Sequence, residues 1–367
     1  MPRSLQYDRQ LFGVTLTLCF IGAVMVFSAS AVMSRDTYGS PYIFLIRQLI
    51  FLILGIVGMF ALMNLDYRRL RQPKMALTAL SFTILLLLLV FLFDRSHATH
   101  RWIRIGPAGI QPSEFAKLTV ILYLAWFLES RSLMPNFDVN DWRRTLAPAM
   151  GPVLLMAGLV LIEPDMGTAA MIMIVAVAML FMMGFSLRWL GAAALLAIPA
   201  VYLAIVRVPY RYERMKAFLT PGSDPQGHGF QLVQSLIAVG SGGLHGVGLM
   251  ESRQKLFYLP EAHTDFIFAV LCEEFGFIGG FIIVALFAWY AWRGLRAAWR
   301  APDHFGRLLA LGITVLVAGQ ALINLSVVIG LMPTKGIPLP FVSYGGSSLL
   351  VMLLATGVLL NISQHAD

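Results

Sequence analysis

Long apolar stretches recur along the whole chain and leave little of it for a water-soluble domain. Ten of them approach or exceed the length that a helix needs to cross a bilayer, about 20 residues: 12–34, 43–63, 76–93, 113–129, 146–162, 167–185, 189–206, 266–292, 307–331 and 344–362. Only 13% of the residues are charged, about half the share of a soluble domain. The stretches lack the alternation of barrel strands, so helices are expected. The pattern predicts an all-α membrane protein, a ten-helix bundle formed as one domain over residues 1–367.

The basic residues are divided unequally between the two sets of connecting segments. If the N-terminus is cytoplasmic, the inner segments hold fourteen Lys and Arg and the outer ones five, leaving aside the long loop 207–265 between spans seven and eight. Cytoplasmic loops carry the Lys and Arg excess, so both termini are expected in the cytoplasm. The net charge of +8 comes from these short clusters, so no nucleic-acid partner is expected.

The loop 207–265 contains two features of its own. The apolar segment Phe230 to Val239 predicts a short helix on or in the outer leaflet. The glycine-rich run 240–248 resembles a phosphate-binding loop only superficially, because no Gly-Lys-Ser/Thr ends it. We expect tight backbone turns there. Cys19 and Cys272 each lie inside an apolar run without a Cys or His partner, so neither a disulfide nor a zinc site is expected.

Ionisable residues at membrane depth are costly and often mark a functional site. In the predicted orientation all of them lie in the outer half of the membrane or at its outer face: Arg47, Glu114, Lys117, Glu163, Asp165, Asp265, Glu273, Glu274 and Lys335. The inner half has almost no polar side chains. The asymmetry predicts a charged chamber that opens outward.

Structural explanations remain open for most of these residues. Glu114 and Lys117 have the spacing of a local ion pair, and Glu163-Pro164-Asp165 suits the start of a helix. Lys335 could be a simple loop charge. Asp265, where a loop enters an apolar helix, could be an N-cap or a general base with a raised pKa. Only Arg47 is hard to explain without an anionic partner.

The cations of the predicted chamber suit an anionic ligand. Guanidinium and ammonium groups hold pyrophosphates, phosphodiesters and carboxylates. The candidates are Arg47, Arg101, Arg104, Lys117 and Lys335. At a membrane surface such a ligand is expected to be an anionic lipid.

Four motifs in order along the chain resemble one family. They are residues 100–117 (HRWIRIGPAGIQPSEFAK), 163–168 (EPDMGT), 258–269 (YLPEAHTDFIFA) followed by Glu273-Glu274, and 338–348 (PLPFVSYGGSS). Together they resemble the shape, elongation, division and sporulation (SEDS) proteins over essentially the whole chain. Residues 28–34 and 331–336 are more similar to the division branch, FtsW, than to the elongation branch, RodA.

The resemblance implies a peptidoglycan glycosyltransferase of the bacterial cytoplasmic membrane. Such an enzyme polymerises lipid II into β-1,4-linked glycan on the outer face and releases undecaprenyl pyrophosphate. It implies Asp265 as the catalytic general base. The substrate-binding positions expected around it are Arg47, Arg101, Trp102, Arg104, Glu114, Lys117, Glu163, Asp165, His263, Lys335 and Ser343.

The resemblance also implies partners. These are lipid II, the nascent glycan strand, a class B penicillin-binding transpeptidase and other divisome or elongasome membrane proteins. No metal-ligand cage can be identified, although a divalent cation, Mg²⁺ or Mn²⁺, would suit the chemistry. Two other functions are a lipid II flippase and a non-catalytic scaffold for a transpeptidase. A flippase needs polar groups through the inner half of the bundle, and a scaffold needs no charged cavity.

Overall fold

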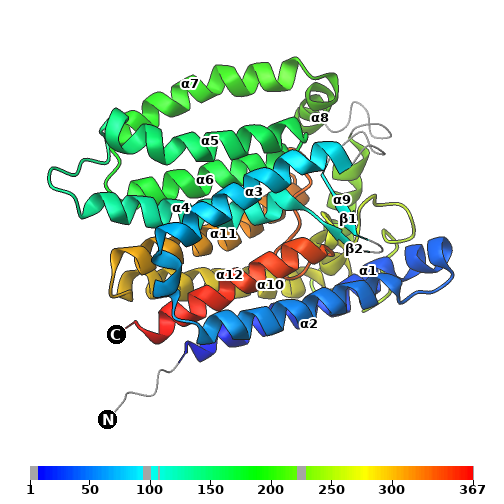
Figure 1. The fold of residues 1–367 in the computed structure, drawn as a ribbon. Coiled ribbons are helices and arrows are strands. Elements are labelled where there is room, and N and C mark those ends of the chain that lie inside the picture. The colour runs from blue at the N-terminus through cyan, green and yellow to red at the C-terminus, as the bar shows by residue number, and fades with distance from the viewer. Residues whose placement is uncertain (1–6, 94–100, 106–107, 221–228, 367) are drawn as a thin grey trace, which may run out of the picture.

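The computed structural model describes residues 7–93, 101–105, 108–220 and 229–366, and its elements are mostly helices packed side by side. The start of α1 and the end of α12 lie at one end of the bundle, and α8, α9 and a small hairpin lie at the other (Figure 1). Central helix α11 contacts α4, α6, α10 and α12. The helices are α1 (Arg9–Tyr38), α2 (Ile43–Asn64), α3 (Pro73–Phe93), α4 (Pro112–Ser132), α5 (Ala147–Ile162), α6 (Met166–Met182), α7 (Leu187–Val206), α8 (Pro209–Leu219), α9 (Phe230–Ser241), α10 (Ile267–Arg300), α11 (His304–Val328) and α12 (Gly346–Gln364), with short turns η1 (Tyr67–Arg71) and η2 (Trp142–Leu146).

Each of the ten predicted spans coincides with one of these helices, α1 to α7 and α10 to α12. Within the described residues, seven helical segments are long and apolar enough to cross a membrane: Arg9–Tyr38, Ile43–Asn64, Pro73–Leu92, Trp142–Ile162, Ile267–Arg300, His304–Val328 and Gly346–Gln364. Helix α6 is apolar but shorter. The chain is a mostly helical, multi-pass membrane protein, and ten crossings remain a prediction.

A two-stranded hairpin precedes α4, which the expectation of an all-α fold did not include. Strands β1 (Ile103–Ile105) and β2 (Ala108–Ile110) are antiparallel, with Ile103 opposite Ile110. Strands of three residues are too short to show alternation in a sequence. Ser347 fixes the hairpin to the start of α12: its hydroxyl donates to the carbonyl of Gly109 (3.2 Å) and accepts from the N–H of Gln111 (3.1 Å).

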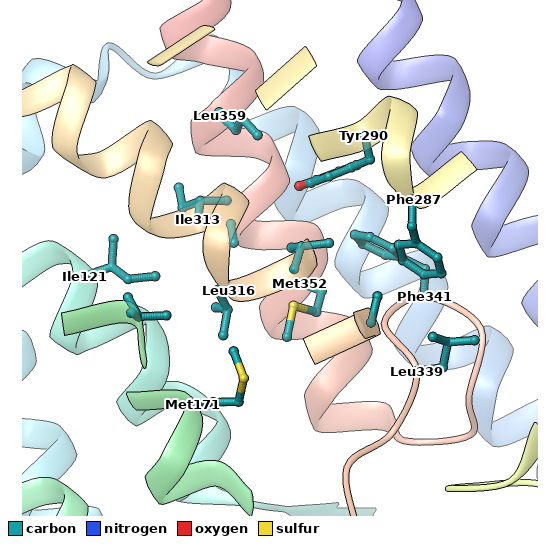
Figure 2. Close-up of a cluster of buried hydrophobic side chains, with 14 of the residues drawn as sticks. Ile121, Met171, Phe287, Tyr290, Ile313, Leu316, Leu339, Phe341, Met352 and Leu359 are labelled. Atoms are coloured by element: carbon teal, nitrogen blue, oxygen red, sulfur yellow. The ribbon is translucent and has the colours of Figure 1, made fainter. Parts of the chain in front are cut away.

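The loop between α11 and α12 is anchored in the hydrophobic core. Leu339 and Phe341 are buried, and Phe341 lies beside Phe287 of α10 among the apolar residues of Figure 2. The rings of Phe341 and Tyr290 lie 5.8 Å apart between centroids. Helix α1 presses on the same loop at Gly22, where a Cβ would overlap the carbonyl oxygen of Phe341. The part of this loop that follows Lys335 and carries Ser343 is therefore held from two sides.

Helix α10 is interrupted at Gly276, whose φ of 66° and ψ of −163° are not helical. The glycine-rich run pairs with the interrupted backbone. The N–H of Phe277 donates to the carbonyl of Gly243 (2.8 Å), and the carbonyls of Glu273 and Glu274 accept from the N–H groups of residues 247 and 248, both at 3.0 Å. The predicted tight turns are confirmed, because Gly243, Gly246 and Gly248 have positive φ.

Two helices lie inside the loop 207–265. The helix predicted over Phe230 to Val239 is confirmed as α9, and α8 precedes it. Cys19 and Cys272 are both buried and free.

Candidate active site

A cavity of about 390 Å³ is lined by residues of α8 and α9 and by Arg101, which precedes the hairpin. Four of the predicted site residues line it: Arg101, Asp165, Asp265 and Lys335. Arg214 of α8 and Glu261 contribute two further charges, and Met166, Met215 and Phe266 supply apolar walls. Segments far apart in the sequence thus meet around one mixed, charged and apolar space.

Asp265 ends the loop before α10 and is fixed through its backbone. Asn324 of α11 donates to the carbonyl oxygens of Asp265 (2.8 Å) and Ile337 (2.7 Å), which ties the two cavity loops together. The carboxylate lies close to Gly336, where a Cβ would be 3.2 Å from Oδ2. The N-cap of α10 is Phe266, and no side chain bonds there. Asp265 is therefore not a helix cap, which removes the structural alternative considered above.

The pKa of the Asp265 carboxyl is raised to near neutral pH. Burial, and to a smaller extent the charge of Glu261, raises the pKa of Asp265 to about 7, although Arg214 and Arg101 act in the opposite direction. A carboxyl with such a pKa can hold or release a proton near pH 7, as a general base requires.

A second layer of hydrogen bonds holds the segment 263–265. The hydroxyl of Ser343 donates to the carbonyl of Thr264 (2.6 Å) and accepts from the N–H of Leu339 (2.8 Å). The N–H of Tyr344 donates to the carbonyl of His263 (3.0 Å). His263 packs against Phe44, with centroids 4.9 Å apart, and burial lowers its pKa. Ser343 and His263 are buried behind the cavity, where they position Asp265.

Arg101 and the turn after α5 form the opposite wall. The Arg101 guanidinium donates to the carbonyl of Glu163 (3.0 Å) and to that of Pro164. Asp165 caps α6 by accepting from the N–H of Thr168 (3.0 Å) and also accepts from the side chain of Gln111 (3.2 Å). Asp165 thus starts a helix, as one alternative predicted, and lines the cavity as well.

Glu163 is a buried carboxyl behind this wall. Its side chain is 0% exposed, and neither carboxylate oxygen has a hydrogen-bond partner among the described residues. Burial, with a further contribution from Asp165, raises its pKa to about 8, against the lowering effect of Arg101. Glu163 therefore holds its proton near pH 7.

The remaining cavity cations are Lys335 and Arg214. The Lys335 ammonium has no hydrogen-bond or carboxylate partner in the described part of the chain, and burial lowers its pKa. Arg214 donates to the carbonyl of Thr334 (3.5 Å), next to Lys335. The sequence carries no signal that places Arg214 in the site. A side chain on a short helix in a long loop has no periodicity that links it to Asp265.

Glu114 and Lys117 form a buried ion pair rather than a cavity wall. The Lys117 ammonium lies 2.8 Å from Oε2 of Glu114 and donates to Oε1 of Gln320 (2.8 Å). Gln320 in turn donates to the carbonyl of Pro338 (2.9 Å). The pair supports the cavity loop through Gln320.

Lys117→Met is expected to destabilise the folded protein by about 3–5 kcal/mol, because it leaves the Glu114 carboxylate buried without its counter-charge. The double variant Glu114→Gln/Lys117→Met removes both charges, so its loss of folding stability should be clearly smaller. Thermal unfolding in detergent measures both. A single variant no less stable than the double one would contradict the ion pair as described.

Two predicted residues, Arg47 and Trp102, do not line the cavity. Arg47 of α2 lies 5.4 Å from the ring centroid of Tyr38 and forms no ion pair with a described carboxylate. Trp102 is 37% exposed on the hairpin. For Arg104 the structure describes the backbone in β1, and its side chain lies outside the described part.

Glu273 and Glu274 belong to a separate buried cluster. Glu274 accepts from Lys255 (3.0 Å) and from Ser28 of α1 (2.6 Å), and Glu273 accepts from Ser252 (2.5 Å). These contacts fix the loop after the glycine-rich run to α10 and α1. Among the described residues no group of three or more His, Cys, Asp or Glu side chains is placed to hold a metal ion.

Comparison with known proteins agrees with this architecture. The FtsW/RodA/SpoVE family of cell cycle proteins matches residues 9–367. Stage V sporulation protein E of Bacillus subtilis (strain 168) is 43% identical over 98% of this chain and 97% of its own length. The probable peptidoglycan glycosyltransferase FtsW of Trichlorobacter lovleyi is 44% identical over 98% of this chain and 94% of its own.

Solved structures share the fold. The rod shape determining protein RodA of Thermus thermophilus superposes with a TM-score of 0.72 and 29% identity, covering 100% of both chains. A chain from a study of how a peptidoglycan synthase complex coordinates polymerization and crosslinking gives a TM-score of 0.76 and 32% identity, covering 97% of both chains.

The fold and the cavity define a multi-pass membrane protein with a charged site at one end of its bundle. The chain belongs to the FtsW/RodA/SpoVE family, the SEDS proteins, as its four motifs indicated.

Proposed function

We propose that this protein is a peptidoglycan glycosyltransferase that polymerises lipid II on the outer face of the bacterial cytoplasmic membrane. One observation carries the proposal. A carboxyl tuned to a pKa of about 7, Asp265, shares a cavity with Arg101, Arg214 and Lys335 at the mouth of a membrane bundle. The name of the FtsW relative, a probable peptidoglycan glycosyltransferase, supports the same reaction.

The residues suggest a single displacement. Asp265 takes the proton from the 4-hydroxyl of the acceptor GlcNAc, and that oxygen attacks C1 of the donor MurNAc. The bond from C1 to the pyrophosphate breaks, and undecaprenyl pyrophosphate leaves. Attack on an α-linked donor inverts C1 and gives the β-1,4 bond, so one base suffices without a covalent sugar intermediate.

The developing negative charge of the pyrophosphate needs cations that are already in place. Arg101 and Arg214 are held by backbone carbonyls of the cavity walls, while Lys335 has no partner in the described structure and is available to a ligand. A divalent cation is compatible with this chemistry, but no step in the proposal depends on one.

The proposed orientation places both termini in the cytoplasm and the cavity outside, because the inner segments carry fourteen of the nineteen basic residues compared. The lipid II headgroup is then within reach of the cavity in the outer leaflet. A class B penicillin-binding transpeptidase is the proposed partner, supported by the similarity to a chain of a peptidoglycan synthase complex. Other divisome or elongasome proteins are further candidates.

Purified protein, alone and with its transpeptidase, tests the function when it is given lipid II in vesicles. Glycan strands on a denaturing gel are the expected product. If no glycan forms but labelled lipid II crosses the vesicle membrane, the protein is a flippase. If neither occurs while the transpeptidase is bound and activated, it is a scaffold.

The rate of polymerisation is expected to rise with pH and level off above about 7. Asp265 must be deprotonated to accept a proton, and its pKa is raised to about 7, so the active fraction falls about tenfold for each pH unit well below that value. Single-turnover rates between pH 5 and 8.5 measure the profile. If Glu163→Gln keeps activity but removes this rise, the titrating group is Glu163 rather than Asp265.

A further inference from the structure

The start of α1 and the end of α12 lie at the opposite end of the bundle (Figure 1). A second cavity is lined by residues from these two segments and from the end of α10. Its volume is about 350 Å³. Among the described residues, four arginines and a single carboxylate line it: Arg9, Arg293, Arg296, Arg300 and Asp8. In the proposed orientation this end faces the cytoplasm, far from the chemistry assigned to Asp265.

Asp8, the one described carboxylate of this cavity, already has hydrogen-bond partners within the protein. Asp8 caps α1 by accepting from the N–H groups of Gln10 and Leu11, both at 3.0 Å. It also accepts from Nε of Arg293 (2.7 Å). Arg9, Arg296 and Arg300 form no ion pair with any described carboxylate. The described residues of the cavity therefore carry a positive charge that no described carboxylate compensates, which favours an anion.

An apolar groove adjoins this cavity along α10. It has a volume of about 460 Å³ and is lined by Trp292, Leu295 and Trp299 together with Arg296 and Arg300. The two arginines thus line both spaces. They follow Trp292 at intervals of four residues, which places the three side chains along one face of the helix. Trp292 and Trp299 are each 67% exposed.

The combination of the two spaces identifies the chemistry of the ligand. A free anion would need only the cationic cavity, and it gives no reason for two large exposed indoles beside it. Tryptophan is enriched at membrane interfaces, and basic pockets on the cytoplasmic side of membrane helices bind anionic lipid headgroups. An amphiphile with one anionic head and an acyl chain would occupy both spaces at once.

We propose that the cavity at Arg296 and Arg300 and the groove at Trp292 and Trp299 together bind an anionic phospholipid of the cytoplasmic leaflet. The guanidinium groups hold the phosphodiester as charge-assisted donors. The acyl chain lies along the groove between the indoles. The site is separate from the proposed polymerase cavity and does not depend on that activity.

Native mass spectrometry of the full-length protein, titrated with phosphatidylglycerol, tests the proposal. The wild type should bind one molecule about tenfold more tightly than phosphatidylcholine with the same acyl chains. Arg296→Ala/Arg300→Ala should lose about tenfold or more of that affinity, since both charge-assisted contacts disappear. The matched control Arg143→Ala/Arg144→Ala removes two exposed arginines at η2 and should change the affinity by less than about twofold.

Three results would overturn the assignment. They are unchanged affinity in Arg296→Ala/Arg300→Ala, equal binding of phosphatidylcholine, and displacement of the lipid by an equal concentration of inorganic phosphate, which would mark a free-anion site. Thermal unfolding shows whether each variant is folded. Phosphatidylglycerol should raise the melting temperature of the wild type and of the Arg143/Arg144 control, but not that of the Arg296/Arg300 variant.

Discussion

Asp265→Asn is expected to lower the rate of lipid II polymerisation by about 10²–10⁴-fold. The amide keeps the shape of the side chain but cannot take the proton from the acceptor hydroxyl. The fold should survive, because the contact that fixes this residue is a hydrogen bond from Asn324 to its backbone carbonyl. Glycan formation by purified protein with its transpeptidase measures the loss.

Glu261→Gln is the matched control for this variant. It makes the same chemical change in another carboxyl that lines the same cavity. Because the Glu261 charge contributes to the raised pKa of Asp265, its removal should shift the pH profile to lower pH and change the maximal rate by less than about tenfold. A loss in Glu261→Gln equal to that in Asp265→Asn would mean that cavity charge, and not a base at position 265, limits the reaction.

Gly246→Ala is expected to destabilise the protein by about 3 kcal/mol or more. Gly246 has a φ of 82°, and a Cβ there would overlap the backbone carbonyl of Glu274 at the interruption of α10. No side chain can move aside to relieve the contact. The glycine-rich run would have to leave α10, and the freed backbone groups of residues 273, 274, 277 and 278 would lose their partners.

Gly158→Ala is the control for this substitution. Gly158 lies in α5, and a Cβ there would meet nothing within 4 Å. Alanine favours helix more than glycine by up to about 1 kcal/mol, so this variant should be neutral or slightly stabilising. Thermal unfolding in detergent compares the two. Equal stability of Gly246→Ala and the wild type would show that the run does not pack on α10 as described.

The sequence predicts most about this protein where a pattern, such as a long apolar stretch or a motif, has a direct physical reason. Each of the ten apolar stretches coincides with a helix, because only helices satisfy their backbone in lipid, while ten crossings stay a prediction. The motifs contain Arg101, Asp165 and Asp265, and the charge pattern added Lys335; these four residues line one cavity. The glycines of 240–248 indicated turns, but their partner, the break in α10, depends on a contact between two distant segments.

Other features had no usable signal in one sequence. The roles of Arg214 and Asn324 depend on how α8 and α11 pack, and packing is not encoded in local periodicity. Ser343 and Lys117 are expected to bind substrate, and Lys117 alternatively to form a local ion pair with Glu114. The structure gives both residues hydrogen bonds within the protein, and a role of either in substrate binding stays a prediction. A polar residue at membrane depth can serve the ligand or hold the wall that faces it, and its sequence position does not separate the two roles.

A structure of Asp265→Asn with bound lipid II would test the central claim most directly. The proposal predicts the pyrophosphate between Arg101, Arg214 and Lys335, and the acceptor 4-hydroxyl at hydrogen-bond distance, about 3 Å, from the side chain at position 265. A pyrophosphate held elsewhere, for example beside Arg47 and Tyr38, with no sugar hydroxyl near position 265, would contradict it.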